Sequence, residues 1–298
     1  MKRGAIAVLL GALVLVSPAQ AAQPWEQAVA TAIGKSGAEM PGGVYRIGLP
    51  RSDLHVTLDG VTLKPALALG SWLAFMPHGE GQVMVMGDLV LTDTEVNRVM
   101  AKLVAGGIEI TALHNHLLRN SPHTMYMHIA GHGDPAQLAK VLHDALALSG
   151  TPLSTPSPAA NPTAPDTIDL DITALDHIMG RKGKVGGGVY AFGIPRAETP
   201  RDGGMELPVA MGSAVAINFQ PTGGGKAAIT GDFVLTAAEV NPVLRELRQN
   251  GIEVTALHNH MLDDEPRLFF MHFWANDDAQ KLARGLAAAL SHVAVAAN

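Results

Sequence analysis

Histidines at repeated spacing are the residues of this chain best suited to chemistry. Two segments each carry an H-x-H pair followed by a third histidine: His114, His116 and His128 in the first, and His258, His260 and His272 in the second. On a strand, side chains two residues apart share a face, about 7 Å apart. If the third histidine lies on a neighbouring strand, three imidazoles converge. Three imidazoles leave the fourth position of a tetrahedral zinc ion open to water, the arrangement of a hydrolytic metal centre.

Three roles for the six histidines follow from the residues. They form a metal site in each repeat, or they line the groove of a non-catalytic envelope binding protein for a metal, cell-wall or small-molecule ligand, or they make a structural contact between the two units. All-nitrogen ligation suits zinc, copper or nickel. Although the chain has 13 methionines, Met125, Met127 and Met271 alternate away from the histidines, so zinc is predicted ahead of copper. His132 is either a further ligand or a turn residue, and Asn276 stands at its equivalent position.

Acidic residues near the histidines have local explanations. Asp88 and Asp232 follow glycine before a predicted helix. Either can orient an imidazole or accept a proton from metal-bound water, but a role in a turn or helix start is favoured. Glu95 and Glu239 are each three residues after a threonine, which is the spacing of a capping box. No catalytic residue is assigned.

The histidines lie within an internal repeat. Residues 107–116 read GIEITALHNH and residues 251–260 read GIEVTALHNH, so nine of ten positions agree. The repeat is far longer than a solenoid unit, which favours duplicated domains. A segment rich in Pro, Ser, Thr and Ala, residues 150–165, separates the copies and is predicted to be a linker. The predicted units are residues 22–149 and 166–298.

Hydrophobic periodicity predicts an α+β fold for each unit. Helical spacing follows the first capping box and ends at Gly106 and Gly107, just before the strand of the GIE segment. Two strands follow, Ile108–Leu117 and Thr124–Ile129, with Ile110 on the face of His114. A last helix begins at Pro135. Each unit therefore ends β-α-β-β-α, and we predict an antiparallel or mixed sheet covered by helices, ferredoxin-like in part.

The N-terminus has the pattern of a secretory signal peptide. Lys2 and Arg3 precede an apolar stretch, Ile6–Val16, that is short for a membrane span, and Ala19–Ala21 supplies a small-x-small cleavage site. Cleavage is predicted after Ala21, which makes residues 1–21 the signal peptide and the mature chain periplasmic or secreted. No later apolar run is long enough for a transmembrane helix.

Composition excludes several classes of function. The 298 residues include no cysteine, so thiolate metal sites, disulfides and cysteine nucleophiles are excluded. The net charge is -6, with no long basic run, which argues against nucleic-acid binding. Aromatic residues make up only 4%, which disfavours stacking platforms. The partners that remain are a small molecule or a component of the cell envelope.

Three segments together carry a family resemblance. Residues 86–92 (MGDLVLT), 107–118 (GIEITALHNHLL) and 125–134 (MYMHIAGHGD) resemble the LppY/LpqO family of secreted bacterial proteins, which is built around a domain of unknown function. The resemblance covers both units and implies an exported bacterial protein, but no established activity. Many members are lipoproteins, whereas this chain lacks the lipid-modified cysteine. The second unit has residues 275–278 (ANDD) in place of GHGD, which argues against two equal active sites.

Overall fold

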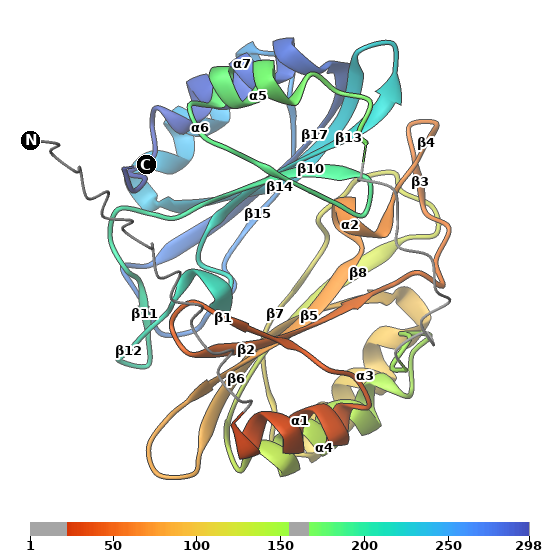
Figure 1. Ribbon diagram of the computed structural model, residues 1–298, viewed down its shortest axis with the longest axis vertical. Coiled ribbons are helices and arrows are strands. Elements are labelled where there is room, and N and C mark those ends of the chain that lie inside the picture. Colours follow the sequence, from red (N-terminus) through yellow and green to blue (C-terminus); the bar gives the residue numbers. More distant parts are fainter. Residues whose placement is uncertain (1–22, 155–166, 298) are drawn as a thin grey trace, which may run out of the picture.

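Two similar α/β halves make up the part of the chain that the computed structural model describes, residues 23–154 and 167–297 (Figure 1). The predicted signal peptide and residues 155–165 of the predicted linker lie outside the described residues. The first half contains α1 (Pro24–Ile33), β1 (Ala38–Met40), β2 (Val44–Pro50), β3 (Thr57–Leu58), β4 (Val61–Thr62), α2 (Pro65–Ala68), β5 (Gly70–Pro77), β6 (Val83–Thr92), α3 (Asp93–Ala105), β7 (Glu109–His114), β8 (Thr124–Gly133) and α4 (Pro135–Leu146). The second half contains α5 (Ile172–Met179), β9 (Lys184–Gly186), β10 (Val189–Ile194), β11 (Arg201–Asp202), β12 (Met205–Glu206), a 3₁₀ turn (Val209–Met211), β13 (Val215–Gly223), β14 (Lys226–Thr236), α6 (Ala237–Gln249), β15 (Glu253–His258), β16 (Asp264–Glu265), β17 (Leu268–Asp278) and α7 (Ala279–Leu290).

Each half is built on one six-stranded sheet, and the two sheets have equivalent strand orders. The first sheet runs β1-β2-β5-β6-β8-β7 and the second runs β9-β10-β13-β14-β17-β15. Neighbouring strands pair antiparallel throughout both sheets, so neither is mixed. The first half ends in the order β-α-β-β-α, and the second half has the same order with the short strand β16 inserted between β15 and β17. The likeness to a ferredoxin fold stays a prediction.

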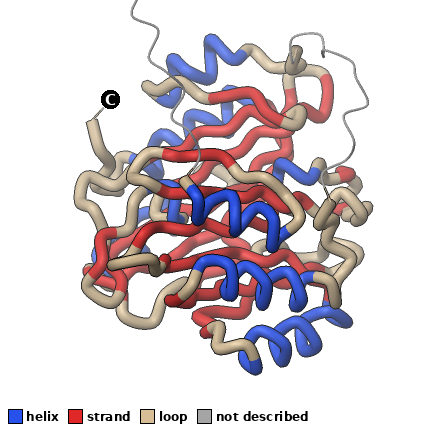
Figure 2. Tube along the Cα trace, turned by 60° about the horizontal axis from the view of Figure 1, so that its bottom comes forward, coloured by secondary structure: helices blue, strands red, loops and turns tan. Residues whose placement is uncertain are grey.

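The sheets face each other, and the longer helices cover their outer faces (Figures 1 and 2). Alternation along the strands explains this layering, because successive side chains point to opposite faces. In β8, Met127 joins the core beneath the helices of the first half, and Met271 of β17 joins the corresponding core of the second half. His128 and His272, the next residues along, therefore project between the sheets.

Both predicted capping boxes form, and each glutamate also binds a buried arginine that the sequence analysis missed. Arg51 donates to Glu95 at 2.8 Å and to the carbonyl of Val90 at 2.7 Å. In the second half, Arg196 donates to Glu239 at 2.7 Å and to the carbonyl of Val234 at 2.6 Å. Arg51 thus ties the loop after β2 to the junction between β6 and α3. Arg196 ties the loop after β10 to the junction between β14 and α6.

The strand that carries the first H-x-H pair differs from its prediction. β7 ends at His114 rather than at Leu117, and its register with β8 shifts between Ile110 and Ala112. A bulge adds one residue on one side of a ladder and so reverses which face the preceding side chains occupy. As a result, Ile110 packs against the core beneath the helices. The prediction that Ile110 shares the face of His114 is wrong.

Candidate functional site

The six predicted histidines meet between the two sheets in one cluster. Rings from the two halves stack in pairs, with centroid separations of 3.4 Å for His114–His258, 3.6 Å for His128–His260 and 3.7 Å for His116–His272. The pairing follows a pseudo-twofold relation, because exchanging each residue for the one 144 positions away reproduces the same pairs. The sequence places one triad in each unit; the structure combines the two triads.

Local structure explains how each triad is positioned. His114 is the last residue of β7, and His116 lies two residues beyond the strand, where its ring stacks on Tyr126 at a centroid distance of 3.4 Å. His128 lies in the middle of β8, paired with Ala112 of β7. The second half repeats this arrangement with β15, β17 and a stacked Phe270.

Two aspartates belong to the site, which corrects their predicted role. Asp88 and Asp232 lie within β6 and β14 rather than in a turn or at a helix start, because each strand continues for four more residues. Register pairs Asp88 with His128 and Asp232 with His272. In both pairs the histidine Nε2 and the aspartate Oδ1 are 3.9 Å apart, too long for a hydrogen bond.

All six histidines have a buried Nε2 atom with no hydrogen-bond partner among the described residues. On the other side of the ring, His272 Nδ1 lies 2.8 Å from the carbonyl of Gly231, and Nδ1 of His114 and of His258 lie 3.3 and 3.4 Å from backbone carbonyls. A carbonyl only accepts, so Nδ1 must carry the proton in these three rings. Their Nε2 atoms then present free lone pairs to the interior of the cluster.

Burial keeps the imidazoles uncharged. It lowers the pKa of His114 to about 4 and of His258 to about 3, and the other four pKa values lie well below the ordinary value. Burial also raises the pKa of Asp88 to about 8, against the opposing charge of Arg46, and raises that of Asp232. At neutral pH the cluster is therefore not held together by histidine–aspartate ion pairs.

Ligand atoms in the cluster are close enough to surround a metal ion. Within each of three sets, one ligand atom per residue lies within 4.8 Å of all the others. The sets are His114, His116, His128 and His260; His114, His258 and His272; and Asp232, His260 and His272. The largest set takes three imidazoles from the first half and one from the second. A metal ion bound there would therefore have ligands from both halves.

One side of the cluster opens onto a cavity of about 660 Å³ between the sheets. Both aspartates and four of the histidines contribute to its wall: Asp88, Asp232, His116, His128, His260 and His272. Sequence reasoning did not single out two further lining residues, Arg46 and Trp72. The available signal was a lone charge within an otherwise apolar strand, VYRIGLP.

The remaining histidines of the first half lie outside the cluster. His132 is exposed and its ring centroid is 5.5 Å from that of His78, so it is not a further ligand. His123 contacts Asp93 at 2.8 Å. The GHGD segment has a structural role in part: Asp134 caps α4, and the aspartate that ends ANDD, Asp278, caps α7 in the same way.

Comparison with solved structures gives only distant matches. A trimeric bacterial microcompartment shell protein, PduB, is 13% identical over 85% of this chain and 88% of that chain, with a TM-score of 0.21. EtuB from Clostridium kluyveri is 8% identical over 86% of this chain and 88% of that chain, also with a TM-score of 0.21. TM-scores this low support no conclusion about fold or function. Comparison with curated proteins gives no match.

No helix among the described residues is both long and apolar enough to cross a membrane.

A family model matches both halves. The family model describes a domain of unknown function, DUF1259, and matches residues 27–148 and 173–292. The LppY/LpqO name stays a prediction. Because the two matches together span most of the chain, the protein belongs to the DUF1259 family and carries two copies of its domain in tandem.

Proposed function

We propose that the histidine cluster is a transition-metal centre shared by the two halves. The observation that carries this proposal is the set of six buried Nε2 atoms without a partner among the described residues. A buried polar atom left unpaired costs about 1–3 kcal/mol. Six such atoms gathered in one place are therefore costly, unless a ligand takes up their lone pairs.

The alternative of purely structural histidines has less support. Structural histidines are expected to be hydrogen-bonded on both ring nitrogens, or paired with carboxylates. Here the two nearby carboxylates lie 3.9 Å from Nε2, too far for a hydrogen bond, and burial raises their pKa values. The cavity beside the cluster also gives a ligand space to enter.

Zinc is the metal we propose, ahead of copper or nickel. Neutral imidazole nitrogens suit all three metals. Tetrahedral zinc has Zn–N bonds of about 2.0–2.1 Å, so the set within 4.8 Å needs only a modest inward movement of the rings. Met127 and Met271 point away from the cluster into the cores, which removes two thioether ligands that would favour copper.

The cavity favours water activation as the chemistry of such a centre. A ligand set that is open on one side leaves a position for water, and bound zinc makes that water acidic. Asp88 and Asp232 line the same cavity. A zinc ion bound beside them would lower their raised pKa values, and they would then be placed to orient an imidazole or to take a proton from water. We infer a hydrolytic centre as the reaction class, acting on a substrate in the cavity.

Export remains part of the proposal. The N-terminal residues 1–21 have the charge and apolar pattern of a signal peptide. We infer that the working protein is periplasmic or secreted. Edman sequencing of the protein from the culture medium or the periplasm should begin at Ala22, and an intact Met1 would contradict cleavage after Ala21. A protein found only in the cytoplasmic fraction would contradict export.

Metal content tests the central proposal. The protein should be purified without a His tag or chelator, supplied with zinc, dialysed and measured by elemental analysis. His116→Ala should lower the zinc content to background, because it removes an imidazole of the largest ligand set. His132→Asn is the matched control: this histidine is exposed on the same strand as His128, and the second half has Asn276 at that position.

The control should keep the zinc content of the wild type. Circular dichroism and urea unfolding of both variants would show whether they remain folded. A wild type that takes up no metal when zinc, copper and nickel are supplied to separate samples would contradict the proposal and leave a structural role for the histidines.

A further inference from the structure

The cavity beside the cluster is asymmetric, although the cluster is not. Strand register identifies equivalent positions in the two halves: Trp72 pairs with Asp88, and Ala216 pairs with Asp232. In the same way, Arg46 of β2 corresponds to Ala191 of β10, since each follows the tyrosine that pairs with a phenylalanine of the next strand. The first half thus contributes a cation and a large ring where the second half has two alanines.

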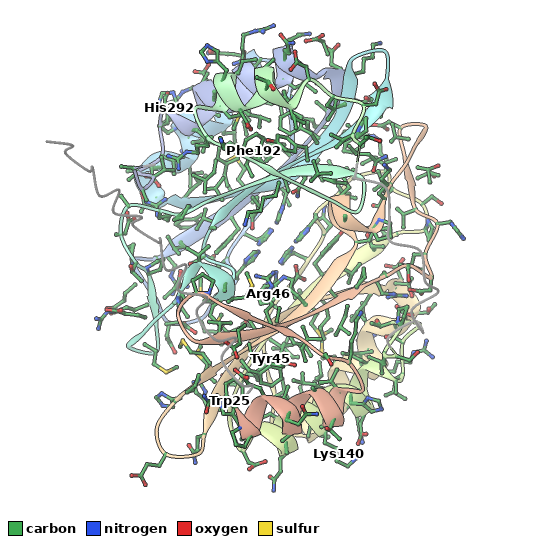
Figure 3. The ribbon with its side chains drawn as sticks, viewed as in Figure 1. Trp25, Tyr45, Arg46, Lys140, Phe192 and His292 are labelled. Atoms are coloured by element: carbon green, nitrogen blue, oxygen red, sulfur yellow. The ribbon has the colours of Figure 1, made fainter. Side chains whose placement is uncertain are left out.

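Arg46 holds a charge in the cavity that no carboxylate neutralises at contact distance. Its guanidinium carbon lies 4.1 Å from the centroid of the Trp72 ring, and Nη1 donates to the carbonyl of Ala210 at 2.8 Å. Within the described ranges this is its only hydrogen bond, so most of its five N–H donors are unused. Figure 3 shows Arg46 in the space between the two sheets.

Other buried arginines of the molecule are used differently. Arg51 and Arg196 each bind two carboxylates, at 2.8 Å or less. Among the described residues, no carboxylate lies within ion-pair distance of Arg46; Asp88 acts on it only through its field, and burial lowers the pKa of the guanidinium. A partly buried guanidinium with unused donors is a ready partner for a planar anion.

The rest of the cavity suits an apolar body. Its volume, about 660 Å³, lies in the range of about 300–1,000 Å³ that is usual for small-molecule sites. Its walls include Leu67, Tyr126, Pro208 and Val215. Ala216 lines the cavity where the first half has the large ring of Trp72, so the second half leaves the space that the ligand would fill.

We propose that this cavity binds a small organic monocarboxylate, with its carboxylate on Arg46 and its apolar body between the sheets. Among the residues that line the cavity, Arg46 is a partly buried cation and Lys184 is an exposed one, and a single guanidinium matches a single negative charge better than a phosphate dianion. The inference goes beyond the metal centre and does not require it, because Arg46 belongs to none of the three sets of possible metal ligands.

Isothermal titration calorimetry with matched probes tests this inference. Octanoate and 4-phenylbutyrate supply a carboxylate on an apolar body, and octanol and 4-phenylbutanol supply the same bodies without the charge. At least one acid should bind the wild type at millimolar concentration or below, and more tightly than its alcohol. Arg46→Ala, which installs the residue of the second half, should weaken that binding about 10- to 100-fold.

Two further variants separate recognition from folding. Arg181→Ala is the matched control, because Arg181 also donates one hydrogen bond to a backbone carbonyl, at 2.8 Å to Ala296, but does not line the cavity. It should bind the acid as the wild type does. Ala216→Trp keeps Arg46 but fills the space, and should abolish binding of the acid.

The possible outcomes are distinct. Equal binding of acid and alcohol, no binding of either acid, or unchanged affinity in Arg46→Ala or in Ala216→Trp would each overturn the inference. Zinc content is measured on the same samples. Acid binding that persists in a protein that takes up no metal would contradict the metal proposal alone, while zinc uptake without acid binding would contradict this inference alone.

Discussion

The two halves of the molecule agree in one set of residues and differ in another. Both halves keep three histidines and one aspartate at the contact between the sheets, and both keep an arginine bound to the capping glutamate. They differ at Arg46 and Trp72, which the second half replaces by Ala191 and Ala216. The residues that repeat in both halves suit a metal ion, because a metal ion is spherical. Asymmetry suits an organic ligand with two different ends.

The largest expected effect concerns the shared scaffold. Removing one partner of a buried ion pair costs about 3–5 kcal/mol, so Arg51→Met and Arg196→Met should each lower the free energy of unfolding by that amount. Urea unfolding measures it. Arg201→Met, in an exposed pair with Glu206, should change little. A large effect in only one half would show that the repeated residues are not equivalent in energy.

Metal removal should have the next largest effect. A ligand at about 1,000 times its dissociation constant stabilises the folded state by about 4 kcal/mol. Saturating zinc should therefore raise the unfolding free energy of the metal-free protein by up to that amount. His114→Ala and His258→Ala should both lose this increase, since the two rings stack across the halves at 3.4 Å. Loss in His114→Ala alone would indicate the largest ligand set, which contains His114 but not His258 and takes one imidazole from the second half. An unchanged increase in both variants would contradict the metal proposal.

Asp88 and Asp232 should affect the affinity for zinc more than the stability of the fold. Groups that orient metal ligands typically contribute about 10- to 100-fold in affinity. Asp88→Asn and Asp232→Asn should weaken zinc binding by about that factor, measured by competition with a chromophoric chelator. Unchanged affinity in both variants would return the aspartates to a structural role. A larger loss in Asp232→Asn would make this residue a direct ligand, as its place in one ligand set allows.

The smallest expected effect is a decrease in the free energy of unfolding at acid pH, to which both halves contribute. Burial alone would raise the pKa values of Glu95 and Glu239, but hydrogen bonds from Arg51 and Arg196 and from backbone amides bring them below the ordinary value. A lowered folded-state pKa gives stability that is present above the unfolded pKa and is lost as pH falls through the folded one. Unfolding free energy should therefore fall below about pH 4.3, with a shallower slope in Glu95→Gln and in Glu239→Gln.

Patterns that are local in sequence were sufficient to predict several parts of the molecule. The capping boxes and the strands with their covering helices rest on spacing within a few residues, and each histidine triad lies within one strand–loop–strand segment. Alternation alone placed Met127 and Met271 on the face away from the histidines, and in the structure both lie in the cores beneath the helices.

Other parts depend on contacts between distant segments. The bulge in β7 reverses the face of Ile110, and no residue in that strand indicates it. The place of Asp88 beside His128 follows from the register between β6 and β8. The stacking of His128 on His260 depends on how the halves meet. Arg46 and Arg51 stood out in no motif, because their partners lie far along the chain.

The most direct test of the central claim compares zinc content across the two halves. His116 and His260 are equivalent positions in different halves, and both belong to the largest ligand set. A shared centre predicts that His116→Ala and His260→Ala each bring the zinc content to background while His132→Asn keeps it. Two independent sites would instead leave each variant with half of the wild-type zinc, and that result would contradict a centre shared between the halves.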